Sequence, residues 1–368
     1  MQTAIPYMQL RGGSSKGLYF EARNLPDNPA LRDRIVIAAM EGLGVGDPRQ
    51  IDGLGGANSL TSKVAVVSPS KLQGADLDYL FLQVEVGKGK VSSAQNCGNI
   101  LAGVVPFAIE CGIITAQDGL TSARVNMLNT GGICEIVVAT PNSWVTYAGN
   151  TRVDGVPGTA APILCNYLDI EGSTCGALFP TGKLVDEING IKLTCIDNGM
   201  PVVILAASEL GMTGYESQGV LDGNEALKKQ LEEIRLIIGP LMNLGDVKTK
   251  TIPKMCLVSA PQSTGLINTR MFIPHVCHEA IGVLAAISVA SACVVRGTVV
   301  HDVIMFPDNK LNLLSIEHPS GELTVTLDYD FNSDGKIIIS RSGVMRTTRL
   351  LSKGEVFIPG PEFLVIKR

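Results

Sequence analysis

The sequence predicts an α+β fold of two pseudo-symmetric domains, each a central helix wrapped by strands, with an active-site cleft between them. Its 368 residues exceed what one hydrophobic core usually serves. The 40 glycines, against 9 Phe and 1 Trp, indicate many tight turns between aliphatic elements. A strand, a polar loop with a cysteine and a long apolar helix follow one another twice, once in each half. We therefore place the domains at 1–180 and 181–368, and leave open that the last residues return to the first domain.

Charge and cysteine content narrow the class of protein. The formal charge is −5 and no basic run is present, which argues against a nucleic-acid partner. The longest apolar stretch, 280–295, contains serines and is shorter than the roughly 20 residues of a membrane span, and no signal peptide precedes it. Nine cysteines without the spacing of metal ligands favour reduced thiols. We expect a cytoplasmic protein with no membrane segment, no metal and no cofactor.

The first strands are predicted to form a hairpin with a basic turn. Residues 5–10 and 18–20 have extended patterns, and the glycine-rich segment between them presents Arg11, Ser15 and Lys16. Such a loop can bind an anion through its cations and backbone N–H groups; a glycine turn with solvated charges is the equally weighted alternative. A helix is predicted next over 27–40, after a Pro-Asp-Asn-Pro start signal.

Lys63 is the first candidate for chemistry. A loop over 52–62 that is rich in glycine and hydroxyl groups, Ser59 among them, leads this lysine to the start of an apolar strand at 64–67. A lysine amine in that position can act as a base, and loops at strand ends commonly carry ligand contacts. The alternative is a lysine whose stem lies along the strand while its ammonium stays in water.

Cys97 is the second candidate. A strand pattern over 79–91 leads into Gln95-Asn96-Cys97-Gly98-Asn99, and an apolar run from 100 to 114 follows. If the run is a helix, the cysteine lies at its N-terminus, where unpaired N–H groups favour an anion such as a thiolate or a carboxylate. Pro106 lies inside the run and is expected to bend it. A structural cysteine in a core helix is the alternative.

The remaining chain is predicted as strands interrupted by two helices. The helices are expected at 223–242 and 280–294. The loop before the second one carries His275, Cys277 and His278, and a later hairpin turn carries His318 and Ser320; hydrogen-bonded packing is the alternative for each histidine. Strands are expected at 124–128, 132–139, 144–148, 162–167, 191–196, 202–206, 255–258, 270–273, 312–317, 322–329 and 335–342.

Five motifs resemble the signatures of the PrpF family. They are Arg-Gly-Gly-Ser-Ser-Lys-Gly (11–17), Asp-Gly-Leu-Gly-Gly-Ala-Asn-Ser-Leu-Thr-Ser-Lys-Val-Ala (52–65), Gln-Asn-Cys-Gly-Asn-Ile-Leu-Ala-Gly (95–103), Asp-Gly-Val-Pro-Gly-Thr-Ala-Ala-Pro (154–162) and Glu-His-Pro-Ser-Gly (317–321). Segments beginning at Cys195, Met242 and Phe272 resemble the family's tautomerase branch. The resemblance covers essentially the whole chain, and it implies the diaminopimelate epimerase-like fold.

The resemblance also implies an activity. It indicates a cofactor-independent 1,3-allylic proton shift in an unsaturated tricarboxylate such as 4-oxalomesaconate, in aromatic-acid catabolism, with Lys63 as catalytic base and Cys97 as active-site cysteine. Cys277 is not in the setting of the second thiol of amino-acid epimerases, which argues against two-thiol racemisation. The alternatives are 2-methylaconitate cis–trans isomerisation in propionate catabolism and a non-catalytic accessory protein that binds polycarboxylates.

A tricarboxylate needs several donors, so we predict a substrate-binding set in two groups. The first group is expected on one side of the cleft and the second on the other, and a homodimer is left open. The first group is Arg11, Ser15, Lys16, Ser59, Asn96, Gly98 and Asn99, and the second is His275, His278, His318 and Ser320.

Overall fold

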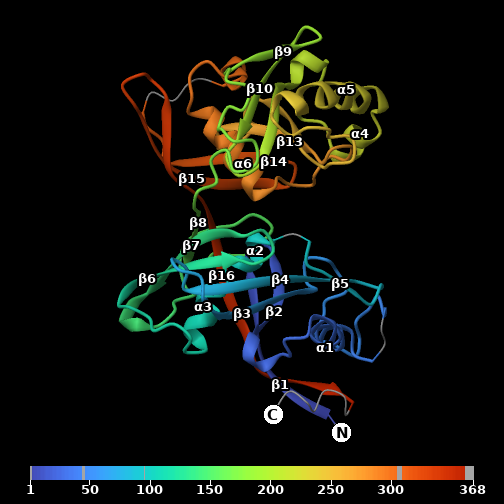
Figure 1. Ribbon diagram of the computed structural model, residues 1–368, viewed down its shortest axis with the longest axis vertical. Helices are drawn as coiled ribbons and strands as arrows, with labels where there is room; N and C mark the ends of the chain where they lie inside the picture. The colour runs from blue at the N-terminus through green and yellow to red at the C-terminus, as the bar shows by residue number, and fades with distance from the viewer. Residues whose placement is uncertain (1, 44–45, 95, 305–308, 361–368) are drawn as a thin grey trace. The chain divides into compact units, whose positions relative to one another are not determined.

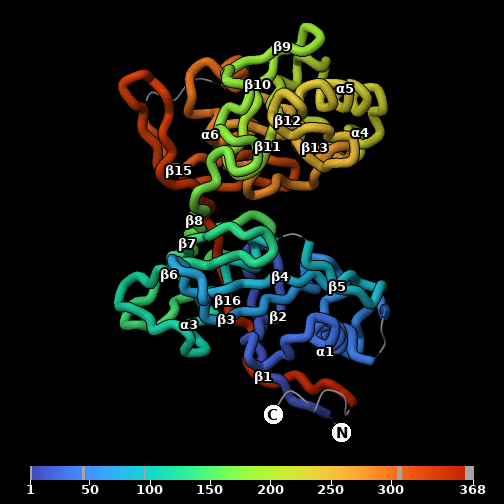
Figure 2. The backbone as a smooth tube through the Cα atoms, in the orientation of Figure 1, coloured from blue at the N-terminus to red at the C-terminus, as the bar shows by residue number. Residues whose placement is uncertain are grey.

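The structure, a computed structural model, describes residues 2–43, 46–94, 96–304 and 309–360 (Figures 1 and 2). The chain divides into two compact units, 1–166 with 346–368, and 167–345. The division lies after residue 166, not near 180 as expected from composition. The last strand returns to the first unit because it pairs with the first strand from Gln2 opposite Pro359 to Gly12 opposite Thr348. Long-range pairing of this kind leaves no mark in local composition.

The first unit is made mainly of strands. They run in the hydrogen-bonded order β1-β2-β3-β4-β6-β7-β8, with β2–β3 and β4–β6 parallel. Its elements are β1 (Gln2–Gly12), β2 (Ser15–Glu21), the 3-10 turn Ala22–Asn24, α1 (Pro29–Glu41), β3 (Lys63–Pro69), β4 (Leu77–Glu85), β5 (Lys90–Ser92), α2 (Gly98–Leu101), α3 (Val104–Glu110), β6 (Gly119–Met127), β7 (Gly132–Thr140), the 3-10 turn Pro141–Ser143 and β8 (Pro162–Tyr167).

Helices cover both faces of this sheet. Leu18 and Phe20 of β2 point to one face and join α1 in a hydrophobic core. Tyr19, between them, points to the other face, where its hydroxyl donates to the Ile100 carbonyl over 2.6 Å and its ring lies 5.7 Å from that of Phe107. The sheet therefore separates the α1 core from a second layer built on α2 and α3.

The predicted helix at 27–40 is confirmed as α1. Pro29 is its first residue, and the side chain of Asn28 accepts a hydrogen bond from the Leu31 N–H over 3.1 Å. An amide cap and a proline at the first position are both favourable at a helix start, because neither leaves an extra N–H unpaired.

The apolar run after Cys97 is buried over 100–108 and partly exposed beyond, and it is not one helix. It forms α2 and α3, separated at Ala102 and Gly103, and the break precedes Pro106. Pro106 lies in the first turn of α3, where a proline has no intrahelical hydrogen bond to remove. It therefore fits the start of this helix and does not bend it. The macrodipole expected at Cys97 is correspondingly small, because α2 has only 4 residues.

The predicted strand at 144–148 is wrong. Positive φ angles at Asn142 (55°) and Ser143 (62°) end the extended chain after β7, and Trp144 is 77% exposed. The alternating pattern of this segment therefore reflects a loop beside the sheet.

The second unit repeats the topology of the first. In both units a hairpin leads to a parallel pair that helices connect, and a second hairpin and parallel pair follow. The elements are β9 (Asp186–Ile188), β10 (Ile191–Asp197), β11 (Pro201–Ala206), the 3-10 turn Ala207–Leu210, α4 (Gln218–Asp222), α5 (Glu225–Leu241), β12 (Lys254–Ser259), β13 (Ile267–Phe272), α6 (Val283–Cys293), the 3-10 turn Val299–Asp302, β14 (Leu313–His318), β15 (Gly321–Phe331) and β16 (Ile337–Pro359), which belongs to the first unit from Arg346 onward.

The repeat gives each helix a counterpart. The connection from β2 to β3 carries α1, and that from β11 to β12 carries α4 and α5; β4 to β6 carries α2 and α3, and β13 to β14 carries α6. The two cysteine loops differ in detail. Cys97 is the N-cap of α2, whereas α6 begins at Val283 with Gly282 as N-cap, and Cys277 is buried in the α5 core. The N-cap of α6 is therefore a glycine and not a thiol.

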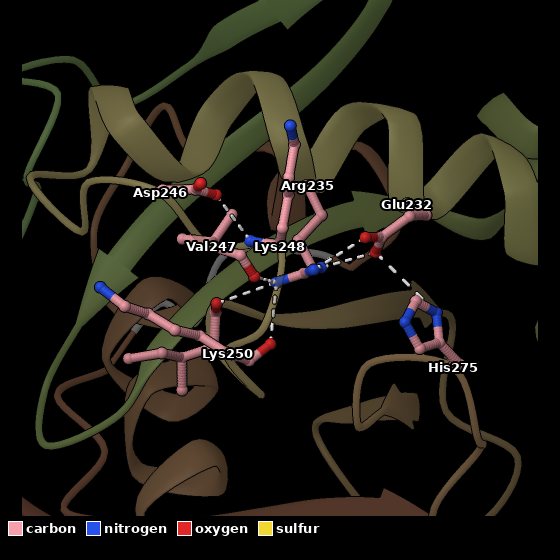
Figure 3. A network of polar contacts seen from close by, with 8 residues as sticks. Glu232, Arg235, Asp246, Val247, Lys248, Lys250 and His275 are labelled. Atoms are coloured by element: carbon pink, nitrogen blue, oxygen red, sulfur yellow. Dashed lines mark hydrogen bonds and ion pairs between the residues drawn. The ribbon is translucent and has the colours of Figure 1, made fainter.

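Arg235 on α5 is fully buried and organises one end of the second unit (Figure 3). Its guanidinium makes two hydrogen bonds to Glu232, over 2.6 and 2.8 Å. It also donates to the carbonyls of Val247, Lys250 and Ile252 over 3.0 to 3.2 Å. These bonds fix the segment that enters β12, because they satisfy carbonyls that helix and sheet leave unpaired.

We expect Arg235→Met to lower the free energy of unfolding by about 3–5 kcal/mol, since Glu232 and three carbonyls lose their donor. The exposed Lys229 on the same helix gives a matched control, Lys229→Met, whose effect should stay within about 0.5 kcal/mol. Chemical denaturation followed by circular dichroism measures both. Equal midpoints for the two variants would contradict the structural role of the Arg235 network.

Candidate active site

Lys63 is held at the very start of β3 by an amide side chain. It is 8% exposed, and its Nζ donates to Gln83 Oε1 over 2.6 Å and lies 5.3 Å from the centre of the Phe81 ring. The Gln83 Nε2 in turn donates to the carbonyls of Ser59 and Ser62 over 3.2 and 3.0 Å. Those two bonds orient the amide with its oxygen toward the lysine. Among the described residues, the lysine forms no ion pair with a carboxylate.

Strand register places this lysine on the face that carries α2 and α3. Lys63 pairs with Gly17 of β2 and with Gln83 of β4, and cross-strand partners share a face. By the alternation of the strands, Tyr19 and Tyr79 lie on that face too. The Tyr79 hydroxyl donates to the Cys97 carbonyl over 3.3 Å, so the same face holds the start of α2.

Cys97 is the N-cap residue of α2. Its backbone is extended, and its carbonyl accepts the first helical bond from Leu101 over 2.9 Å. Its thiol makes no capping hydrogen bond and is partly exposed. Next to it, burial raises the pKa of Tyr19 well above its ordinary value, and the Cys97 sulfur adds to that rise. Tyr19 therefore stays a neutral donor that anchors α2, and the thiol is left available to a ligand.

Two glycines explain how closely α2 approaches the sheet. A Cβ at Gly12 would lie 2.1 Å from the Asn99 carbonyl oxygen of α2, and one at Gly17 would lie 3.1 Å from Ile100 Cδ1 of α2 and 2.6 Å from the Lys63 carbonyl oxygen of β3. Real side chains do not pack at such distances, so only glycine permits the contact. The Asn99 amide then donates to the hydroxyls of Ser14 and Ser15 over 3.1 and 3.3 Å.

The first predicted group of substrate-binding residues is only partly assembled on this face. Ser15, Gly98 and Asn99 meet at the start of α2, and the Ser59 carbonyl contacts Gln83. The Asn96 amide donates to Thr130 Oγ1 over 2.5 Å, which directs it away from Ser15 and toward the β6–β7 turn.

Arg11 and Lys16 lie on the opposite face of the sheet. They pair with one another across β1 and β2, one residue out of phase with Ser15 and Gly17. The Arg11 guanidinium donates to the Gly13 carbonyl and to both oxygens of Thr347, over 2.9 to 3.1 Å. Burial lowers the pKa of Arg11, and Arg349 lowers it further. The predicted convergence of Arg11 and Lys16 with Ser15 is therefore wrong. Consecutive residues of a strand point to opposite faces of the sheet, so neighbours in the sequence motif do not share a face.

In the second unit the predicted histidines fall in two places. His278 is half-buried; its Nδ1 accepts from the Ala280 N–H over 2.8 Å, and burial lowers its pKa. His275 is exposed, with Nδ1 3.9 Å from the Glu232 carboxylate (Figure 3). His318 and Ser320 lie together in the β14–β15 turn, where the serine N–H and the histidine Nδ1 are 3.3 Å apart.

Three residues of the first unit were missed by sequence reasoning. Gln83 and Tyr79 contact Lys63 and the Cys97 backbone, and Asn129 binds both backbone groups of Phe81 over 2.8 and 2.9 Å. The only available signal was the alternation of β4, in which Tyr79, Phe81 and Gln83 share one face. The pairing register of β4 with β3 is what places this face beside Lys63. That register is set by tertiary packing and not by the local sequence.

Among the described residues, no three His, Cys, Asp or Glu side chains are grouped as metal ligands, and no helix is long and apolar enough to span a membrane. A cavity of about 890 Å³ lies in the second unit between Phe179, Leu184 and Phe331. It contains none of the predicted site residues, so volume alone does not identify the site.

A family model described as PrpF protein matches residues 2–359. A 4-oxalomesaconate tautomerase of Pseudomonas putida is 50% identical, over 97% of each chain. A (4E)-oxalomesaconate Delta-isomerase of Novosphingobium is 51% identical, over 96% of this chain and 98% of the relative. A 2-methyl-aconitate isomerase of Cupriavidus necator is 30% identical, over 98% and 99%.

Solved structures extend the comparison. A methylitaconate-delta-isomerase has a TM-score of 0.84 and 32% identity, over 97% of this chain and 96% of that one. A hydroxyproline epimerase from Agrobacterium vitis, with a TM-score of 0.51 and 11% identity over 98% and 94%, shares the fold alone. The predicted epimerase-like α+β fold is confirmed.

Thiol labelling tests the exposure of Cys97. We expect iodoacetamide at pH 8 to modify it first, because only Cys97 and Cys111 among the nine cysteines are partly exposed. Burial raises the pKa of Cys111 to about 11, so about one in a thousand of its thiols is ionised at pH 8. Cys97→Ser should remove the fast phase and Cys111→Ser should leave it; mass spectrometry that finds Cys111 labelled first would contradict this.

Proposed function

We propose that this chain, which belongs to the PrpF family, is an isomerase that shifts a proton along the conjugated system of 4-oxalomesaconate. The observation that carries the proposal is the Lys63 amine, bound to a neutral amide over 2.6 Å on the face that holds the Cys97 loop. The names of the two relatives at about half identity supply the substrate.

The chemistry needs one base and a place for negative charge. The neutral Lys63 amine removes a proton from the carbon beside the double bond or carbonyl, and the C–H electron pair enters the conjugated system as a dienolate. The ammonium, whose three protons are equivalent and exchange with water, delivers a proton to the other end of the system, which completes the isomerisation without any other reactant. Gln83 is suited to this cycle because its amide oxygen accepts a hydrogen bond from the amine and from the ammonium alike.

Cys97 and the start of α2 have a supporting role in the proposal. The N–H groups in the first turn of a helix have no carbonyl within the helix to bind, and they can donate to a carboxylate or to the developing enolate oxygen. Ser15 and Asn99 add a hydroxyl and an amide at the same place. The thiol either contacts the substrate or exchanges a proton with it.

The proposed base predicts a large effect of one substitution. Lys63→Ala should lower kcat for 4-oxalomesaconate by about a thousandfold, equal to about 4 kcal/mol, because a general base is typically worth 10²–10⁴. The matched control is Lys71→Ala, at an exposed lysine after β3. Solvent deuterium incorporation, measured by NMR, should fall in parallel. A Lys63→Ala turnover within about tenfold of wild type would overturn the assignment.

The amide partner makes a second prediction, about charge. Gln83→Glu places a carboxylate where the neutral amide now lies, and an ion pair with that carboxylate holds the lysine as an ammonium. The proposed cycle begins with the free amine, so kcat should fall by about tenfold or more. Gln83→Met, which adds no charge, is the control. Steady-state kinetics measure both variants, and equal kcat values for the two would contradict a catalytic amine at Lys63.

Two alternatives are separated by direct assay. Isomerisation of 2-methylaconitate would use the same base on a similar polyacid, so both substrates should be compared by kcat/KM with one preparation. A polycarboxylate-binding accessory protein would bind these acids and promote no deuterium exchange into them. Exchange into 4-oxalomesaconate that depends on Lys63 favours the proposed function over both.

A further inference from the structure

Lys254 occupies in the second unit the position that Lys63 occupies in the first. Lys63 is the first residue of β3 and pairs with Gly17 of the parallel strand β2. Lys254 is the first residue of β12 and pairs with Val202 of the parallel strand β11. Because the two units share one topology, the start of β12 is the structural counterpart of the start of β3.

Register places Lys254 and His278 on one face of the second sheet. The His278 N–H donates to the Met271 carbonyl over 2.7 Å, beside the bridge between Phe272 and Cys277, and Met271 pairs with Cys256. Lys254 lies two residues before Cys256 and so points to the same side. The residues of opposite phase, Met255, Phe272 and Cys277, lie in the α5 core.

The two side chains are within reach of one small ligand. Two strand spacings across and two residues along the sheet separate their Cα atoms by about 12 Å, and both side chains extend to the same side. The Cys277 N–H donates to Asp222 over 2.6 Å, and its carbonyl accepts from Gln218 over 2.8 Å, so the histidine loop is tied to α4. The His278 ring accepts at Nδ1, which leaves Nε2–H as a donor.

The Lys254 ammonium has no counter-ion among the described residues. The lysine is partly buried, and its ammonium makes no hydrogen bond or ion pair with any residue that the structure describes. Burial and the neighbouring Arg235 lower its pKa to about 8, and Lys254 in turn lowers the pKa of His278. The Glu232 carboxylate is bound by Arg235, and Glu279 acts on His278 from an exposed position. A partly buried ammonium among basic groups, with no carboxylate bound to it, is stabilised by an added anion.

We propose that Lys254 and His278 form a carboxylate-binding site within the second unit, which takes the carboxylate of a small polycarboxylate. The inference rests on the proposed function for the identity of its ligand and on the geometry of the second unit for its place. Lys254 binds and orients in this proposal and transfers no proton.

Three variants test the site. Lys254→Met removes the charge and keeps the length of the side chain, Lys254→Arg keeps the charge, and Lys192→Met is a control at an exposed lysine of β10. The probe is tricarballylate, a saturated tricarboxylate that cannot react, titrated into the full-length protein by calorimetry. Inorganic phosphate is titrated in parallel to show whether the site prefers a carboxylate or any oxyanion.

We expect Lys254→Met to raise the Kd for tricarballylate at least about tenfold, which is typical of losing a hydrogen bond to a charged group. Lys254→Arg should recover part of the affinity, and Lys192→Met should match wild type. Without ligand, Lys254→Met should unfold at the same temperature as wild type or higher, because an uncompensated charge is removed. A lower unfolding temperature with unchanged Kd would mean a structural lysine and would overturn the site, as would tighter phosphate than tricarballylate binding.

Turnover separates this inference from the proposed function. If wild type isomerises 4-oxalomesaconate and Lys254→Met binds tricarballylate as tightly as wild type does, the site is wrong and the function stands. If wild type binds tricarballylate through Lys254 and does not isomerise 4-oxalomesaconate, the site stands and the function is wrong. His278→Asn, which removes the Nε2 donor, gives a second estimate of the same loss should Lys254→Met fail to fold.

Discussion

The register of β2, β3 and β4 is the constraint on which the first unit depends. It sets Lys63 between Gly17 and Gln83, so the lysine meets a residue without a side chain on one side and an amide on the other. A slip of one residue would turn the lysine into the α1 core and put Val64 in its place. The glycine on β2 also lets Ile100 of α2 pack against the sheet. One pairing therefore positions the lysine, its partner and the cysteine loop together.

The two units share one topology and carry different side chains at equivalent positions. At the start of β3 an amide receives the lysine, and at the start of β12 no described residue does. After β4 the loop presents a partly exposed cysteine as N-cap, and after β13 it buries its cysteine and presents a histidine. Duplication of a fold thus preserves where side chains emerge, while the residue types at those places give each unit its own chemistry.

Uncharged partners recur around the candidate base. Gln83 orients toward Lys63, Asn129 fixes the strand beneath it, and Tyr79 and Tyr19 hold the two carbonyls that begin α2. These groups are amides and tyrosine hydroxyls, so they place no carboxylate beside the lysine before or after proton transfer. A preorganised neutral frame of this kind avoids the reorganisation that a carboxylate partner would require.

The sequence by itself determined the fold class, the repeat, α1 with its Asn28 cap, and Lys63 and Cys97 as the candidate residues, because local patterns and motifs carry these signals. It did not determine that Arg11 and Lys16 lie across the sheet from Ser15, that the run after Cys97 breaks at Gly103, or that Gln83 receives the lysine. Strand register and long-range pairing decided those points. A contact between residues distant in the chain is fixed by packing of the whole unit, and no local pattern encodes it.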